Sequence, residues 1–363
     1  MTDRASPTPT GADQPLAAVV QKGRVDATVR GLRAEGVYDE TRRLREHDAG
    51  AVEVPVTDSP AETAVLDVIR QVDPEPRISG LPDLLAERGW TDAEIERAPG
   101  SWAVVGTVVL VTFEDCPRPA DVGEALLELH GEADTVVADY GISGAHREPE
   151  IEVVAGEGDT ETVHTEHGTR YALDLSEVMF SPGNQAERVR MGEVVAGEAP
   201  PAAQGDHEGP ERVLDMFAGI GYFTLPMARA GAQVTAVERN PTAFRYLLEN
   251  TALNDVRHRV EPYRGDCRNV VARMSAEGPV ADRVVMGYYD APEFLDTALS
   301  AVRPGGVIHL HATVAEPELW DEPLETLEGA AELAGKEVEV LDKRIVKSHS
   351  EGVQHVVVDG RVR

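Results

Sequence analysis

The chain has 363 residues, enough for two or three domains, and its 65 acidic and 34 basic residues give a formal net charge of −31. No apolar run approaches the roughly 20 residues of a membrane span, and the polar residues 1–15 lack the apolar core of a secretory signal. The two cysteines, Cys116 and Cys267, form neither a disulfide framework nor a metal-ligand cluster. We therefore expect no membrane association, no bound metal and a reduced, cytoplasmic setting.

The acidic surplus by itself argues against nucleic acid as a partner, because nucleic-acid-binding surfaces are normally basic. The chain also has only four lysines and 5% aromatic residues, a composition that fits adaptation to high salt. At molar salt the Debye length is only about 3 Å, so net negative charge does not repel a distant polyanion. We favour salt adaptation, which leaves RNA open as a partner.

The first 98 residues are predicted to form a tail and a small module. Residues 1–15, rich in Ser, Thr, Pro and Gly, are typical of a disordered tail. Apolar residues recur with a helical period over 16–48 and again over 61–97, and a short strand is expected at 51–56. We interpret 16–98 as a small α/β module.

Strand patterns dominate the next segment, 99–178. A helix is expected near 121–129. Strands are predicted at 102–111 (one strand or a pair), 135–138, 150–154 and 170–173. We interpret this segment as a β-rich module that docks tRNA.

A regular alternation of strands and helices begins at Arg212, after a predicted solvated loop at 195–210. Strands are predicted at 212–216, 233–237, 259–263, 282–286 and 305–311, with two more at 338–343 and 355–358. The alternation predicts an α/β, Rossmann-like, doubly wound and mostly parallel seven-stranded sheet, closed by an antiparallel hairpin, in a domain at 179–363. Ligands bind at the carboxyl ends of such strands, so residues that follow them should cluster at one edge.

The stretch 213–226 is typical of a strand, a glycine turn and the start of a helix. Gly219 and Gly221 allow a tight turn and close approach of a ligand to the backbone, and the helix dipole favours that ligand. Thr224 stands where a dinucleotide fingerprint has its third glycine. We therefore predict a nucleoside cofactor without a pyrophosphate, most simply S-adenosylmethionine, and a sheet of the class I methyltransferase type.

Acidic residues end two of the predicted strands. Glu238, roughly 20 positions after the glycines, is placed to accept hydrogen bonds from ribose hydroxyls; the alternative is a surface glutamate that caps the helix at Pro241. Asp266 can accept from an adenine amino group, and its alternative is a helix N-cap. We expect Cys267 to offer its backbone amide rather than its thiol.

Two flanking segments also carry candidate residues. An arginine at 188 or 190, after the stretch 180–184, could hold a methionine carboxylate bidentately, and a solvated arginine fits the spacing equally well. The fourth strand ends in Met286-Gly287-Tyr288, without the Asn and Pro that present a backbone carbonyl to a target amino nitrogen. This end is either not shaped for amino-group methylation or an ordinary turn.

His309 and His311 alternate on the fifth predicted strand, so both lie on one face. They could act as acid and base, but a strand histidine is more often packed. We name no catalytic residue.

Together these motifs resemble those of the archaeal and eukaryotic enzymes that modify position 37 of tRNA. One branch comprises tRNA (guanine-37-N1) methyltransferases, and the other comprises aminocarboxypropyltransferases of wybutosine synthesis. The methyltransferase branch has Met-Asn-Leu-Pro at the end of the fourth strand, whereas Met286-Gly287-Tyr288 is similar to the other branch. The matching pieces are 215–221, 238–241, Asn254, Gly265-Asp266, and Phe180-Ser181 with Glu187-Arg188.

The resemblance implies transfer of the 3-amino-3-carboxypropyl group of S-adenosylmethionine to carbon 7 of 4-demethylwyosine in tRNA-Phe, with methylthioadenosine released. The partner would be the anticodon loop, and we expect a monomer. The resemblance, the glycine turn and the end of the fourth strand together give the predicted cofactor-binding residues. They are Ser181, Arg188, Asp215, Phe217, Ala218, Gly219, Gly221, Glu238, Asp266, Cys267 and Gly287. Three alternatives stay open: the guanine-37 methyltransferase, a small-molecule methyltransferase, and a non-catalytic protein that binds cofactor and RNA.

Overall fold

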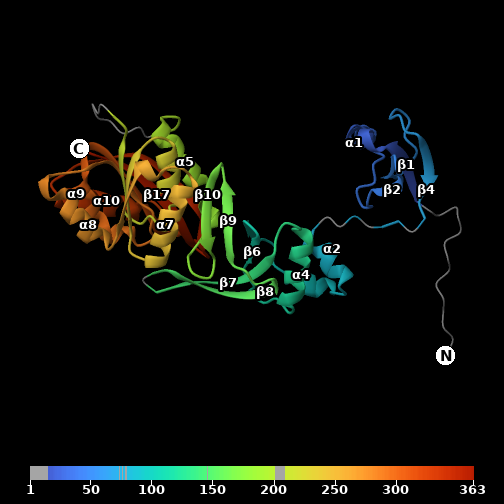
Figure 1. Cartoon of the computed structure of the whole chain (residues 1–363), viewed down its shortest axis with the longest axis horizontal. Helices are drawn as coiled ribbons and strands as arrows, with labels where there is room; N and C mark the ends of the chain where they lie inside the picture. The colour runs from blue at the N-terminus through green and yellow to red at the C-terminus, as the bar shows by residue number, and fades with distance from the viewer. Residues whose placement is uncertain (1–14, 73, 76, 78–79, 145, 201–208) are drawn as a thin grey trace. The chain divides into compact units, whose positions relative to one another are not determined.

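The computed structural model describes residues 15–363, except 73, 76, 78–79, 145 and 201–208 (Figure 1). All but the last residue of the predicted tail, and the centre of the predicted 195–210 loop, lie outside the described residues. The chain divides after Ile95 into two units, and the finer predicted boundaries stay predictions. Within the described part of the chain, no helix is long and apolar enough to cross a membrane.

The first unit is built on a four-stranded antiparallel sheet with strand order β2-β3-β1-β4. Its elements are β1 (Leu16–Gln21), α1 (Val25–Ala34), β2 (Arg45–Asp48), β3 (Ala51–Val56), β4 (Asp67–Arg70), α2 (Leu81–Glu87) and α3 (Asp92–Ile95). The strand at 51–56 is confirmed, whereas the helical predictions for 16–21 and 67–70 are wrong. β1 is an inner strand with four consecutive buried residues, so it lacks the alternation that marks a half-exposed strand.

The second unit begins with a sheet of strand order β5-β6-β7-β8, followed by the hairpin β9–β10. Its elements are β5 (Ala103–Val105), β6 (Val108–Val111), α4 (Pro119–Leu129), β7 (Thr135–Ser143), β8 (Glu148–Gly156), β9 (Glu161–Glu166) and β10 (Thr169–Asp174). The strand pair and the helix are confirmed; α4 is the crossover between parallel β6 and β7. β9 was missed because Val163 is its single apolar side chain.

The rest of the second unit is a seven-stranded sheet with strand order β13-β12-β11-β14-β15-β17-β16. Its strands are β11 (Arg212–Asp215), β12 (Gln233–Glu238), β13 (Val260–Arg264), β14 (Ala281–Met286), β15 (Val302–Ala315), β16 (Val338–Ser350) and β17 (Val353–Val362). β11 to β15 are parallel, and β16 and β17 form the antiparallel closure. The predicted α/β, Rossmann-like fold is confirmed.

Helices cover both faces of this sheet, as a doubly wound fold requires. They are α5 (Gln185–Ala196), α6 (Thr224–Arg229), α7 (Pro241–Leu253), α8 (Cys267–Met274), α9 (Leu295–Ala301) and α10 (Asp321–Leu333). Buried side chains of α5, α6 and α7 belong to one apolar cluster, and those of α8, α9 and α10 belong to another. Figure 1 shows α8, α9 and α10 gathered on one side of the sheet, opposite α5 and α7.

The β9–β10 hairpin is fixed to α7 by two buried asparagines. Asn250 accepts from the Ala172 amide at 2.7 Å and donates to its carbonyl at 3.0 Å. Asn254 accepts from the Arg170 amide at 2.9 Å and donates to its carbonyl at 2.7 Å. The two side-chain amides take the place of a neighbouring strand and satisfy the edge of β10.

Candidate active site

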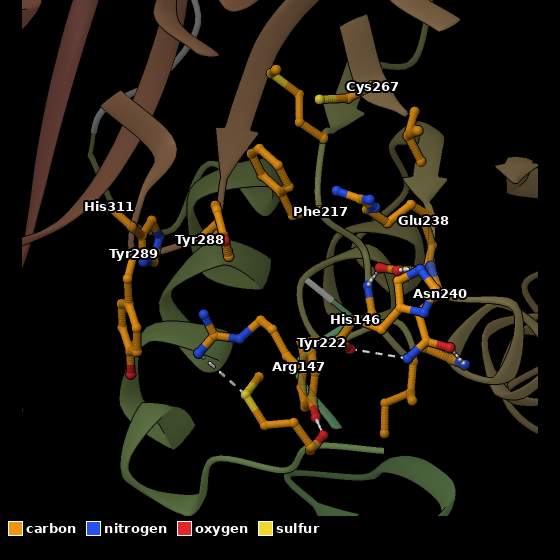
Figure 2. A pocket seen from close by; sticks show the side chains of 18 of the residues that line it. His146, Arg147, Phe217, Tyr222, Glu238, Asn240, Cys267, Tyr288, Tyr289 and His311 are labelled. Atoms are coloured by element: carbon orange, nitrogen blue, oxygen red, sulfur yellow. Dashed lines mark hydrogen bonds between the residues drawn. The ribbon is translucent and has the colours of Figure 1, made fainter. Parts of the chain in front are cut away.

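A pocket opens at the carboxyl ends of the parallel strands (Figure 2). Its lining includes residues that end or closely follow the four strands β11 to β14: Phe217 and Gly219, Glu238, Asp266 and Cys267, and Gly287 and Tyr288. The prediction that the strand ends cluster at one edge is therefore confirmed.

Asp215 stabilises the glycine turn through hydrogen bonds to residues on both sides of it. This side chain is fully buried and accepts from the Thr224 hydroxyl at 2.7 Å and the Phe217 amide at 3.4 Å. Burial raises the pKa of Asp215 to about 6. Gly219 and Gly221 have φ of +56° and +106°, which favour glycine. Asp215, Ala218 and Gly221 do not line the pocket, so they shape the turn that Phe217 and Gly219 present to it.

Glu238 lies at the edge of the pocket, against the glycine turn. Its carboxylate accepts from the Gly219 amide at 2.8 Å and from the Asn240 amide at 2.6 Å. The helix-cap alternative is wrong, because Asn240 caps α7 by accepting from the amides of Thr242 and Ala243. Burial raises the pKa of Glu238, which marks a carboxylate partly withdrawn from water.

Asp266 and Cys267 lie at the start of α8. Asp266 is the N-cap: it accepts from the Arg268 amide at 3.0 Å and pairs with the Arg268 guanidinium at 2.6 Å, which lowers its pKa. The N-cap alternative is thus confirmed, while Asp266 also lines the pocket. Burial raises the pKa of Cys267 to about 11, so its thiol stays protonated at neutral pH and is no nucleophile.

Arg188 is buried, and the solvated-arginine alternative is wrong. Its guanidinium binds both carboxylate oxygens of Glu166 at 2.7 Å and donates to the Ser181 carbonyl at 2.9 Å. It is absent from the pocket lining, whereas Ser181 is part of it. The carboxylate that Arg188 holds bidentately belongs to the chain itself, and the arginine positions Ser181.

Two cations near the pocket were missed by the sequence analysis. Lys347, from β16, donates to the Ser181 hydroxyl at 2.7 Å. Arg147, from the β7–β8 turn, lines the pocket with its guanidinium 5.3 Å and 5.0 Å from the ring centroids of Tyr288 and Tyr289. Lys347 is one of only four lysines, and this scarcity could have indicated that it has a function. No local sequence pattern indicates that Arg147 lines the pocket, because its position depends on the length of the β7–β8 hairpin.

Aromatic side chains form one wall of the pocket. The ring centroids of Phe217 and Tyr288 are 5.0 Å apart, and Phe294 packs edge-on against Phe217 at 5.1 Å. Gly287, next to Tyr288 in the chain, also lines the pocket, and a Cβ atom there would lie 2.6 Å from the ring of Phe223, outside the lining.

Gly287→Ala should therefore lower the free energy of unfolding by about 1–2 kcal/mol, because the methyl group overpacks the Phe223 ring. Gly329→Ala is the matched control: its Cβ meets nothing within 4 Å in α10, so it should stabilise by about 0.5–1 kcal/mol. Denaturant unfolding of both variants tests this. Equal stability of the two would show that Gly287 is not packed as described.

The pocket fits an adenosine linked to a charged group. It offers carboxylate acceptors at Glu238 and Asp266, a flat aromatic wall and a nearby cation. Asn184 Oδ1 and Arg147 Nε are buried there without a hydrogen-bond partner among the described residues, so polar atoms remain for a ligand. The described residues contain no group of three or more His, Cys, Asp or Glu side chains arranged for a metal ion.

Comparison with known proteins agrees with this geometry. The model of the TRM5/TYW2 methyltransferase domain matches residues 162–341, and that of the TYW2 N-terminal domain matches 81–160. A Pyrococcus horikoshii relative, tRNA(Phe) (4-demethylwyosine(37)-C(7)) aminocarboxypropyltransferase, is 38% identical over 74% of this chain and 91% of its own.

Two solved structures cover different lengths of the chain. Trm5b from Pyrococcus abyssi superposes with a TM-score of 0.71 and 30% identity over 96% of this chain and 99% of its own. P. horikoshii TYW2, solved in complex with MeSAdo, gives 0.62 and 35% identity over 78% of this chain and 99% of its own. The chain belongs to the TRM5/TYW2 family.

Proposed function

We propose that this protein transfers the 3-amino-3-carboxypropyl group of S-adenosylmethionine to carbon 7 of 4-demethylwyosine at position 37 of tRNA-Phe. Methylthioadenosine is the second product. The observation that carries the choice is Gly287 at the end of β14: no asparagine side chain stands there to hold a guanine nitrogen, and the Phe223 ring fills the space beside it.

The adenosine end of the donor is assigned to Glu238 and Asp266. Glu238 keeps acceptor capacity for ribose hydroxyls beyond the two amides it binds, and Asp266 faces the same pocket. Ser181 and Lys347 are assigned to the amino-acid end, where a cation offsets a carboxylate.

S-adenosylmethionine supplies a sulfonium with three electrophilic carbons, so its orientation decides which group leaves. The protein controls that orientation by holding the two ends at separate places. Arg188 contributes by fixing the backbone of Ser181 through its bond to the carbonyl.

The target base must leave the anticodon stack to reach the pocket. Tyr288 and Tyr289, with Arg147 across their rings, offer flat faces on which an extruded base can stack. We assign tRNA docking to the β-rich segment 99–178. Because the chain is acid-rich and lysine-poor, we also infer that it works in a salt-rich cytoplasm. That it is a monomer stays a prediction.

The test uses S-adenosylmethionine labelled either in its methyl group or in its carboxyl group, with tRNA-Phe that carries 4-demethylwyosine at position 37. We expect carboxyl label in the tRNA and methyl label in released methylthioadenosine. Methyl label in the tRNA would contradict the proposal. Tight cofactor binding without any transfer would favour the non-catalytic alternative.

Guanine-37-N1 methylation is the second candidate. It is favoured by the Trm5b structure, which covers 96% of this chain, whereas the TYW2 structure covers 78%. A tRNA-Phe with unmodified guanine at position 37 separates the two: only the second candidate puts methyl label into it.

A further inference from the structure

Two histidines form a pair at the end of the pocket away from Glu238. His311 lies on β15 and His355 on the neighbouring β17; both are almost fully buried, and both line the pocket. His311 Nδ1 and His355 Nε2 are 3.0 Å apart, a hydrogen bond. Figure 2 shows His311 beside Tyr289, across the pocket from Glu238 and Asn240.

The outer nitrogens of the pair are unsatisfied. His311 Nε2 and His355 Nδ1 are buried and have no hydrogen-bond partner among the described residues. A neutral imidazole carries one N–H, and one such hydrogen lies between the two rings. In either tautomer, therefore, one outer nitrogen is a bare acceptor and the other is an N–H donor. A proton taken up at one outer nitrogen can pass through the shared bond and leave from the other.

Burial keeps both rings neutral. With help from Arg344 on β16 it lowers the pKa of His311 to about 3, and with help from His311 it lowers the pKa of His355 to about 2. Other charged or titratable groups also face the pair. They are His309 and Asp359 within the sheet, Lys347 and His349 on β16, Glu187 on α5, and Tyr289 after β14, over whose ring lies Arg147 from the β7–β8 turn.

His309, two residues before His311 on the same strand, has no ring nitrogen left without a partner. Its Nδ1 lies 2.6 Å from Asp359 Oδ1 and its Nε2 lies 2.6 Å from Arg283, so both ring nitrogens have partners. Of the two alternating histidines, only His311 lines the pocket.

The pair lies beside the stacking faces assigned to the target base. The Tyr289 ring packs edge-on against His355, with centroids 4.9 Å apart, and Arg147 lies over its face. With adenosine at Glu238 and Asp266, the base enters from the tyrosine side, next to the bare nitrogen.

We propose that the His311–His355 pair is the acceptor of the proton that leaves carbon 7 of the target base. This rests on the proposed function. Carbon 7 forms a bond to the transferred carbon while the bond between that carbon and sulfur breaks, and the electron pair of the broken bond goes to sulfur. The base, now cationic and tetrahedral at carbon 7, returns its C–H electron pair to the ring as its proton moves to the bare imidazole nitrogen. A weak base suffices, because such a cation is strongly acidic.

The test compares His311→Gln and His355→Gln with His258→Gln, an exposed histidine on a different surface, using tRNA with protium or deuterium at carbon 7. We expect each pair variant to lower the single-turnover rate by about 100-fold and to gain a primary isotope effect that the wild type lacks. The control should match the wild type, and calorimetry should give all three the wild-type affinity for S-adenosylmethionine. Imidazole in solution should partly restore His311→Gly.

A rate loss without an isotope effect, or no rate loss, would overturn the proposal and leave the proposed function intact. A wild type that transfers only the methyl group would overturn both. If the variants do not fold, nitrogen-15 chemical shifts of the wild-type histidines at pH 6 test the proposal instead. We expect both rings of the pair to be neutral. An imidazolium at either position would exclude the pair as the proton acceptor.

Discussion

Asp359→Asn should lower the free energy of unfolding by about 3–5 kcal/mol at pH 7, because it removes a fully buried carboxylate from two partly buried arginines and a buried histidine. The Asp359 carboxylate is fully buried on β17 and binds three groups: His309 Nδ1 at 2.6 Å, Arg344 at 2.7 Å and Arg190 at 3.3 Å. His309 and Arg344 hold the pKa of Asp359 far below its usual range. Denaturant unfolding of the variant measures the effect.

Asp342→Asn is the matched control, since Asp342 binds the same two arginines but its side chain is 43% exposed. An exposed pair of this kind contributes at most about 1 kcal/mol. Equal losses for Asp342→Asn and Asp359→Asn would show that burial does not set the strength of this cluster.

The pH dependence of Asp359 has a definite sign. Because its folded-state pKa is depressed, its stabilising contribution is complete above the unfolded value near 3.8 and is lost as the pH falls through the folded value. The stability difference between wild type and Asp359→Asn should therefore be constant at neutral pH and shrink below about pH 4.

Glu238→Ala should weaken S-adenosylmethionine binding by about 2–3 kcal/mol, roughly 30- to 150-fold, because charge-assisted hydrogen bonds are lost. The same carboxylate fixes the amides of Gly219 and Asn240, so its loss also loosens the turn. Methylthioadenosine, which lacks the amino-acid end, should lose affinity by the same factor. Isothermal calorimetry with both ligands measures this.

Glu261→Ala, one strand away on β13, controls for a simple loss of negative charge, since Glu261 is exposed and binds only Tyr263 among the described residues. It should leave both affinities unchanged. If Glu238→Ala also binds both ligands normally, Glu238 does not contact the ribose.

Much of the part of the pocket around Glu238 and Asp266 was predictable. The glycine turn, Glu238 and Asp266 follow strands whose apolar pattern is clear, and parallel strands bring their carboxyl ends to one edge. Asp266 also shows the limit of such a pattern: it caps α8, as one alternative said, and it lines the pocket, while its contact with adenine stays a prediction.

Arg188 and β1 show where pattern alone fails. The motif identified Arg188 as important, but its partner Glu166 comes from β9, a strand that the sequence did not reveal. β1 was mistaken for a helix because an inner strand with both faces covered lacks alternation.

The sequence by itself determined the fold class, the glycine turn and the family, because each depends on residues close together along the chain. Only the tertiary structure decided the other half of the pocket. Arg147 reaches it from a hairpin tip, and the pairing of β15 with β17 brings His311 and His355 together from 44 positions apart. Antiparallel register and hairpin length set these contacts, and no local spacing encodes them.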